Sequence, residues 1–302
     1  MKRIAILGAS GHIGRSLTHT LAQNPDNRLF LFARKTEYVS WFLSANRLLE
    51  RCSVHAVDDF DVQECDIVIN GIGAGDPGLV AALGLEVIAL TEGWDNRIIE
   101  YLGRYPNALY VSVSSGSVYN ASAQKPEGVT AEIYAWAKYN SETLHRNHSD
   151  LNIVDLRLFG YFSRFQDIEG QYFLSQAMSA IRQGEVLKTL SGDMTRDYVT
   201  PSDFVRMIDC CFNHRPINRA YDMFSQESAS KFRILEHLHN EFDLQWTTSD
   251  VEDVTGGALE KPDYVARERD AVEIGFRPEY SALDGVLTEF RCARESGWTS
   301  CN

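Results

Sequence analysis

The chain has 302 residues, 44% of them hydrophobic and 24% charged, values that fit a globular protein with an ample core. Its formal net charge of −13 excludes a general polyanion binder, so neither nucleic acid nor an anionic membrane is an expected partner. No run of about 18 apolar residues is present, and the N-terminus reaches Gly8 too early for a signal peptide. The six cysteines show no zinc spacing, so we expect no metal site and a reducing, cytoplasmic location.

Short apolar runs alternate with helical patterns in the first half of the chain. Strands are predicted over residues 4–7, 29–32, 54–57, 67–69, 109–113 and 153–158, and helices over 14–23, 96–102 and 131–146. The strands are almost continuously hydrophobic, which is typical of parallel strands buried on both faces. The alternation predicts an α/β fold built on a doubly wound parallel sheet of the Rossmann type.

The alternation fades near Gly160. Beyond it, helices are predicted over 173–182, 202–212, 231–241 and 281–292, and a loop of mixed charge over 191–201. We therefore expect an NAD(P)-binding Rossmann domain over residues 1–160. A smaller, mixed domain over 161–302 is expected to bind mainly the substrate, with some of its segments returning to the Rossmann sheet.

A glycine-rich turn follows the first predicted strand and opens the first helix. Glycines let the backbone approach a pyrophosphate closely, and the helix N-terminus offers free N–H groups. In this strand–turn–helix context the turn predicts a dinucleotide site. The site would comprise Gly8, Ser10, Gly11, His12, Ile13 and Gly14. The alternative is a tight strand–helix turn that binds no ligand.

The end of the second predicted strand indicates which dinucleotide binds. Arg34 and Lys35 stand where an acidic residue would bind the ribose of NAD, and a guanidinium suits the 2′-phosphate of NADP. NADP(H) is therefore favoured, and NAD is possible. The alternative is a solvated basic pair at a strand end. Asp58 or Asp59, after the third strand, is a candidate partner of the adenine amino group, or else part of a surface acidic pair.

Tyr134 and Lys138 lie four residues apart in a predicted helix, shortly after the serine-rich strand end at Ser114–Ser117. Residues at i and i+4 project from the same helix face. An ammonium beside a phenol favours the phenolate, so we expect Lys138 to lower the pKa of Tyr134 from about 10. A tyrosine tuned in this way can move a proton to or from a sugar oxygen near neutral pH.

Four motifs in this order resemble the extended short-chain dehydrogenase/reductases, the NAD(P)-dependent nucleotide-sugar epimerase/dehydratase family. They are the glycine turn, the segment Ser114–Tyr119, the pair Tyr134/Lys138 followed by Ser141 and Glu142, and Thr195–Val199 followed by Asp203. The resemblance extends over nearly the whole chain. It implies an enzyme that acts on a nucleotide-diphosphate sugar and forms a homodimer through helices flanking the sheet, the Tyr134 helix among them.

The resemblance also implies roles for individual residues. Tyr134 would be the acid/base, Lys138 would hold the nicotinamide ribose, and Ser115 would bind the substrate oxygen together with Tyr134. Arg196 would meet the diphosphate of the nucleotide sugar, as a guanidinium can bind two oxygens, and Lys261 is a second phosphate candidate. The alternative for Arg196 is a salt bridge within its loop, to Asp193 or Asp197.

Departures from the family pattern narrow the expected chemistry. Gly116 and Ser117 occupy the place of the acidic pair of family dehydratases, so 4,6-dehydration is not expected. The stretch also lacks the cysteine of fucose-forming family reductases. The segment Leu90–Asn96 differs from the asparagine-containing pattern that follows the fourth strand in the family, which would alter the near wall of the substrate pocket.

The favoured function is interconversion of a keto and a hydroxyl group, and specifically reduction of a 4-keto sugar with NADPH. One alternative is a nucleotide-sugar 4-epimerase that retains NAD(P). A second, of another class, is an NADP-binding redox sensor or regulator without turnover.

Overall fold

The computed structural model describes residues 1–73, 75, 77–121, 130–249 and 263–298. The chain divides into two compact units. The first unit comprises residues 1–158, 205–222 and 268–276, and the second comprises 159–204, 223–267 and 277–302. The first break lies beside the boundary predicted at residue 160, and two later segments belong to the first unit.

The first unit contains a seven-stranded, wholly parallel sheet. Its strands, in spatial order, are β11 (Asn218–Asp222), β6 (Ile153–Leu158), β5 (Leu109–Ser115), β4 (Ile67–Asn70), β1 (Lys2–Leu7), β2 (Asn27–Ala33) and β3 (Cys52–Ala56). The order reverses between β1 and β4, where doubly wound sheets bind their ligands. The predicted fold class is confirmed, and the central strands are buried on both faces as their composition indicates.

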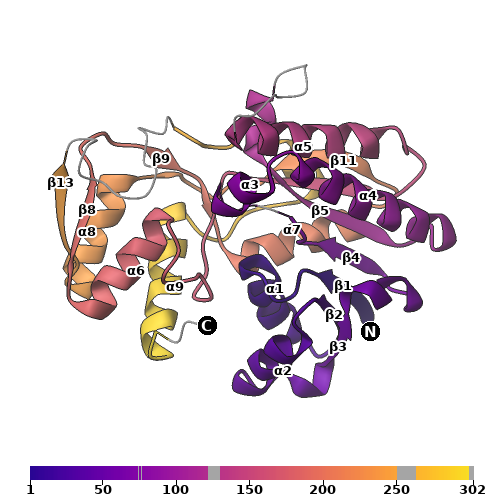
Figure 1. Ribbon diagram of the computed structural model, residues 1–302, viewed down its shortest axis with the longest axis horizontal. Helices are drawn as coiled ribbons and strands as arrows, with labels where there is room; N and C mark the ends of the chain where they lie inside the picture. The colour runs from indigo at the N-terminus through magenta and orange to yellow at the C-terminus, as the bar shows by residue number, and fades with distance from the viewer. Residues whose placement is uncertain (74, 76, 122–129, 250–262, 299–302) are drawn as a thin grey trace. The chain divides into compact units, whose positions relative to one another are not determined.

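Helices cover both faces of this sheet. They are α1 (His12–Ala22), α2 (Thr36–Ala45), α3 (Pro77–Leu83), α4 (Glu86–Arg104), α5 (Thr130–Arg146) and α7 (Pro201–Asn213), with short 3₁₀ helices η1 (Leu49–Arg51), η2 (Val57–Val62), η3 (Gly116–Asn120) and η5 (Asp270–Ile274). In Figure 1, α1 and α2 lie on one side of the sheet and α4 and α5 on the other. Ile98, Tyr101 and Leu102 of α4 pack on Phe32 and Phe60 beneath them. Each such side chain contributes about 1.5–3 kcal/mol by burial.

Helix α4 corrects one sequence-based expectation. It is 19 residues long, whereas the sequence predicted a helix only over 96–102. The segment Leu90–Asn96 therefore lies inside a helix and does not follow the fourth strand, which ends at Asn70. The expectation that this segment directly follows the fourth strand is wrong, because the residues after β4 are Gly71 to Gly73, and its effect on a substrate pocket stays a prediction.

The second unit is smaller and mixed. Its elements are β7 (Gly160–Tyr161), α6 (Phe173–Gln183), β8 (Val186–Leu190), β9 (Thr195–Arg196), β10 (Tyr198–Val199), β12 (Ala229–Ser230), α8 (Lys231–Phe242), β13 (Gln245–Ser249) and α9 (Ala282–Glu295). Its core gathers Leu174 of α6, Leu235 and Leu238 of α8, and Phe290 of α9, and the ring of Phe290 stacks on Phe162 at 5.0 Å. Within the described part of the chain, no helix combines the length and apolarity needed to span a bilayer.

Candidate active site

The predicted glycine turn joins β1 to α1 through a tightly packed backbone. Gly8 has φ +76°, a conformation that L side chains rarely adopt, and its carbonyl accepts a 2.9 Å hydrogen bond from the Gly11 N–H. A β-carbon on Gly14 would overlap the Gly8 carbonyl, so α1 starts directly against the end of β1. The N-terminus of α1 has no side-chain cap. The turn thus has the narrow form that lets a backbone approach a pyrophosphate.

The loop after β4 adds a second glycine-rich wall that the sequence analysis missed. A β-carbon on Gly8 would lie 2.9 Å from the carbonyl carbon of Gly71, whose N–H donates to the Leu7 carbonyl at 3.0 Å. A β-carbon on Gly73 would lie 3.7 Å from Nζ of Lys138. This loop therefore lies against both the glycine turn and the lysine of the predicted pair. The run Gly71-Ile72-Gly73, directly after a buried strand, was the available signal.

The remaining cofactor candidates lie at the ends of β2 and β3, which are paired in the sheet. Arg34 and Lys35 follow β2 and are exposed, and Asp58 is exposed in η2 after β3. The carbonyl of Asp58 accepts a 2.6 Å hydrogen bond from Arg97. The cofactor roles of Arg34, Lys35 and Asp58 stay predictions.

Ser10, His12 and Ile13 are half-buried in the glycine turn and the first turn of α1. Desolvation, together with the neighbouring charge of Arg15, lowers the pKa of His12 to about 3. His12 is therefore neutral at physiological pH. It contributes no charge to the helix N-terminus, where the backbone N–H groups could bind an anion.

Ser115, Tyr134 and Lys138 come together in the first unit. Ser115 is the last residue of β5, and Tyr134 and Lys138 project from one face of α5. A side-chain hydrogen bond links Ser115 and Tyr134. Nζ of Lys138 lies 6.0 Å from the centre of the Tyr134 ring and donates a 2.8 Å hydrogen bond to the Val113 carbonyl of β5. The spacing that the sequence suggested therefore corresponds to one acid/base cluster at the carboxyl end of a strand.

The electrostatics of this cluster differ from the prediction. Burial raises the pKa of Tyr134, and the hydrogen bond from Ser115 opposes this only in part. The expectation of a lowered Tyr134 pKa is wrong for this structure, because desolvation of the phenolate dominates. Tyr134 is accordingly protonated at neutral pH. A protonated phenol can donate a proton to a substrate oxygen.

Lys138 is only 8% exposed, and burial lowers its pKa. Three buried carboxylates oppose this effect: those of Asp95 on α4, Glu142 on α5 and Asp155 on β6. Two carboxylates are bound to His145, since the His145 ring contacts Asp155 at 2.8 Å and Asp95 at 3.4 Å. The lysine is therefore desolvated, and the three carboxylates offset part of the effect of desolvation on its pKa.

Arg196, the predicted diphosphate ligand, lies in β9 of the second unit and is 8% exposed. Its guanidinium lies 5.9 Å from the centre of the Tyr264 ring, and burial lowers its pKa despite the opposing charges nearby. The Asp197 carboxylate accepts from the Ser225 backbone N–H at 2.8 Å, and Asp193 accepts from its neighbour Met194 at 2.9 Å. Both carboxylates thus cap backbone groups. Lys261, the second phosphate candidate, lies outside the described residues.

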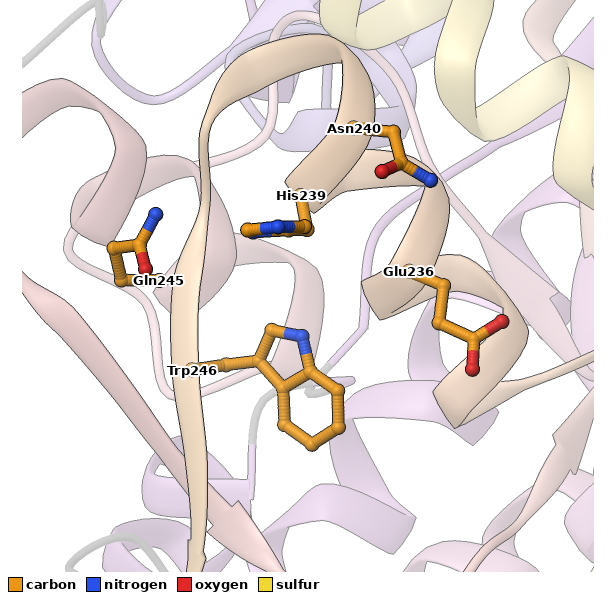
Figure 2. A pocket seen from close by; sticks show the side chains of 5 residues that line it. All are labelled: Glu236, His239, Asn240, Gln245 and Trp246. Atoms are coloured by element: carbon orange, nitrogen blue, oxygen red, sulfur yellow. The ribbon is translucent and has the colours of Figure 1, made fainter.

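The second unit also has a surface depression between α8 and β13, with a volume of about 290 Å³. Figure 2 shows that it is lined by Glu236, His239, Asn240, Gln245 and Trp246. Nδ1 of His239 is hydrogen-bonded to the carbonyl of Leu244 at 2.9 Å, which closes the α8–β13 connection. The depression contains none of the predicted site residues. Among the described residues, no group of three or more His, Cys, Asp and Glu side chains is arranged to hold a metal.

Comparison with known proteins identifies a family and a fold. The family model described as the NAD dependent epimerase/dehydratase family matches residues 4–223. No curated protein sequence matches this chain.

Solved structures resemble the chain over almost its whole length. They include UDP-N-acetylglucosamine 4-epimerase from Methanobrevibacter ruminantium in complex with UDP-N-acetylmuramic acid (TM-score 0.80, 18% identity, 98% of both chains covered). UDP-glucuronic acid 4-epimerase from Bacillus cereus, in complex with UDP-glucuronic acid and NAD, has a TM-score of 0.75 at 17% identity. The match covers 97% of this chain and 99% of the epimerase chain. dTDP-glucose 4,6-dehydratase from Bacillus anthracis, in complex with NAD, has a TM-score of 0.73 at 13% identity. The match covers 98% of this chain and 97% of the dehydratase chain. At these identities the likeness establishes the shared fold.

Proposed function

The chain belongs to the NAD-dependent epimerase/dehydratase family, and from this premise we propose that it reduces the 4-keto group of a nucleotide-diphosphate sugar with NADPH. The observation that carries the proposal is the cluster of Ser115, Tyr134 and Lys138 at the end of β5. A protonated phenol, an orienting hydroxyl and a buried ammonium are the groups needed to convert a carbonyl to an alcohol.

The residues of the first unit fit a dinucleotide. Gly8 and Gly14 have no room for a β-carbon and Gly71 has little, so the backbone at the β1/β4 switch point carries no side chain that would keep a pyrophosphate away. Lys138, beside Gly73, is placed to hold the nicotinamide ribose, and the exposed Arg34 is placed to meet a 2′-phosphate. When bound, the nicotinamide supplies the hydride chemistry.

The roles of the chain's own residues follow from their geometry and charge. Tyr134 is protonated at neutral pH and donates its proton to the carbonyl oxygen of the substrate. Ser115 hydrogen-bonds the same oxygen and orients the carbonyl. Lys138 places a positive charge near the Tyr134 ring and stabilises the phenolate that remains after the proton leaves.

Arg196 of the second unit is proposed to bind the substrate diphosphate. Its guanidinium is buried, and desolvation of the cation is not fully offset by its surroundings, so an anionic ligand would stabilise it. The planar guanidinium can bind two phosphate oxygens at once.

A second candidate function is 4-epimerisation with a retained NAD(P). It is favoured by the structural resemblance to nucleotide-sugar 4-epimerases that were solved with UDP-sugars. The same three residues would serve it, but Tyr134 would also have to accept a proton. That step starts from the phenolate, which the raised pKa of Tyr134 makes scarce at neutral pH, and this favours reduction.

The experiment is to purify the protein, identify any retained cofactor, and then assay a panel of nucleotide sugars and their 4-keto forms. A reductase oxidises one NADPH for each hydroxyl formed and is isolated without cofactor. An epimerase retains its cofactor and interconverts two 4-hydroxyl isomers without net oxidation. Cofactor binding without turnover on any sugar would contradict both functions and support the redox-sensor alternative.

We further propose that the protein is a cytoplasmic homodimer formed through α4 and α5. These helices lie side by side, with Asn140 of α5 donating to Glu92 of α4 at 2.7 Å. Their outer surfaces expose Leu85, Leu90 and Tyr139. Light scattering tests this, because replacing Leu90 with glutamate should yield a monomer if these helices form the interface.

A further inference from the structure

The end of β5 is fastened to α5 at three successive residues. Val113 accepts the hydrogen bond from Lys138, Ser114 donates a 2.6 Å hydrogen bond to the carboxylate of Glu142, and Ser115 bonds Tyr134. Only the middle contact, between Ser114 and Glu142, involves no residue of the catalytic cluster. Ser114 is 2% and Glu142 is 6% exposed, so their hydrogen bond is shielded from water.

The Glu142 carboxylate is shared with a second strand. Arg157 of β6 donates to both of its oxygens, the shortest contact being 2.7 Å from Nη2. Such a bidentate pair fixes geometry as well as charge. The other terminal nitrogen of Arg157 donates to the hydroxyl of Tyr119 at 2.9 Å, and Tyr119 in turn donates to Asp222 at 3.0 Å.

These contacts bracket the catalytic serine. Ser114 precedes Ser115 and is held by Glu142, while Tyr119 lies in the η3 turn that follows Ser115 and is held by Arg157. One ion pair therefore holds both sides of the turn that carries Ser115. The contacts come from three different elements, β5, α5 and β6, so the turn cannot shift without breaking charge-assisted hydrogen bonds.

We propose that the Glu142–Arg157 ion pair positions the catalytic centre: it holds the Ser115 turn in register with the Tyr134/Lys138 face of α5. The inference rests on the proposed function for its kinetic consequence, but not for its structural one. Glu142 touches no reacting atom, so it is a positioning residue. Its negative charge has a second effect. Together with Asp95 and Asp155, Glu142 raises the pKa of Lys138 and so opposes the lowering caused by desolvation.

Two variants separate position from charge. Glu142→Gln removes the charge, whereas Ser114→Ala removes only the hydrogen bond to the strand and leaves the ion pair intact. Glu132→Gln is the matched control, since Glu132 is an exposed glutamate on the same helix. If Glu142→Gln fails to fold, Ser114→Ala still carries the test.

The first measurement is amide hydrogen exchange of the full-length protein over residues 113–120, which does not depend on activity. We expect faster exchange in Glu142→Gln and in Ser114→Ala, and an unchanged rate in Glu132→Gln. Unchanged exchange in both site variants would overturn the proposal.

The second measurement is the pH dependence of kcat with NADPH and a 4-keto nucleotide sugar. Misplacement of the serine should lower kcat by about tenfold to a hundredfold in both variants, with KM nearly unchanged. The alkaline limb of the kcat profile should move to lower pH in Glu142→Gln, because loss of the Glu142 charge lowers the pKa of Lys138. It should not move in Ser114→Ala, which keeps that charge. The other groups around Lys138 are the same in both variants: Asp95, Asp155, His145, Arg157 and Tyr134. Equal kcat values in wild type and both variants would contradict the proposal.

Failure of the proposed function would look different. In that case the wild-type protein turns over none of the nucleotide sugars, while the exchange difference between Glu142→Gln and Glu132→Gln persists.

Discussion

Nζ of Lys138 donates a 2.8 Å hydrogen bond to the carbonyl of Val113, two residues before Ser115. The lysine is therefore anchored to the same strand that carries the serine, and its position does not depend on Tyr134. This arrangement allows the tyrosine to be replaced without loss of the surrounding structure.

Tyr134→Phe is accordingly expected to fold and to bind cofactor as the wild type does, but to lose about 10²- to 10⁴-fold in kcat, the usual contribution of a general acid. Steady-state kinetics and a fluorescence titration with NADPH measure the two quantities. Tyr139→Phe is the control, because Tyr139 is an exposed tyrosine on the same helix. A wild-type rate in Tyr134→Phe would exclude Tyr134 as the proton donor.

Arg34→Gln is expected to weaken NADPH binding by about tenfold, because a charge-assisted hydrogen bond to the 2′-phosphate is lost. The affinity for NADH should not change, since NADH lacks this phosphate. Dissociation constants for both nucleotides, measured for wild type and for the exposed-site control Arg47→Gln, give the comparison. Equal affinity of the wild-type protein for NADPH and NADH would contradict the proposed preference for NADPH.

Arg196→Gln is expected to weaken binding of a nucleoside diphosphate by about tenfold to a hundredfold and to leave nucleoside binding unchanged. Calorimetry with the nucleoside diphosphate that binds wild type most tightly, and with its nucleoside, isolates the phosphate contribution. Arg233→Gln serves as control, because Arg233 pairs with Glu227 at the surface of the same unit. A proportional loss for both ligands would indicate a structural role for Arg196.

His145 predicts a pH-dependent stability. It is fully buried, and although desolvation opposes its charge, contacts with Asp155 and Asp95 raise its pKa to about 9 from 6.5. A folded pKa above the unfolded one gives stability that is fully present below pH 6.5 and lost as the pH rises through 9. The free energy of unfolding should thus fall by about 2 kcal/mol between pH 6.5 and 8.5.

Urea unfolding at several pH values measures this loss. Replacing His145 and Asp155 together by Gln and Asn is the informative variant, because it removes the titrating group and its nearest carboxylate, while Asp95 keeps its hydrogen bonds from Tyr110 and Ser141. The decline should be smaller in that variant. A wild-type free energy that is flat over this range would contradict a charged His145 in the folded protein.

The sequence predicted well those features that depend on local spacing. The buried strands, the turn from Gly8 to Gly14 and the helix carrying Tyr134 and Lys138 all follow from periodicity and short motifs. Helices α2 and α3 were missed, and α4 was predicted too short, because Gly93 interrupts its pattern.

The electrostatics could not be predicted, because they depend on residues distant in sequence. Asp95, His145 and Asp155 come from three elements and meet only in the fold. The sign of the Tyr134 pKa shift was missed for a similar reason. The i, i+4 rule identifies the lysine neighbour, but the extent of burial depends on the packing of the whole unit.

The pairing of β11 with β6 determines which fragments of this protein can be expressed on their own. Strand β11 pairs with β6 along Ile153–Arg157, yet it is made some 60 residues later in the chain, at Asn218–Asp222. A fragment ending at Leu158 would leave β6 as an open edge, with the buried residues Ile153, Val154 and Leu156 on it. Such an edge invites pairing with other chains. The nucleotide-binding half is therefore expected to aggregate when it is expressed as an N-terminal fragment, and it should be studied within the intact chain.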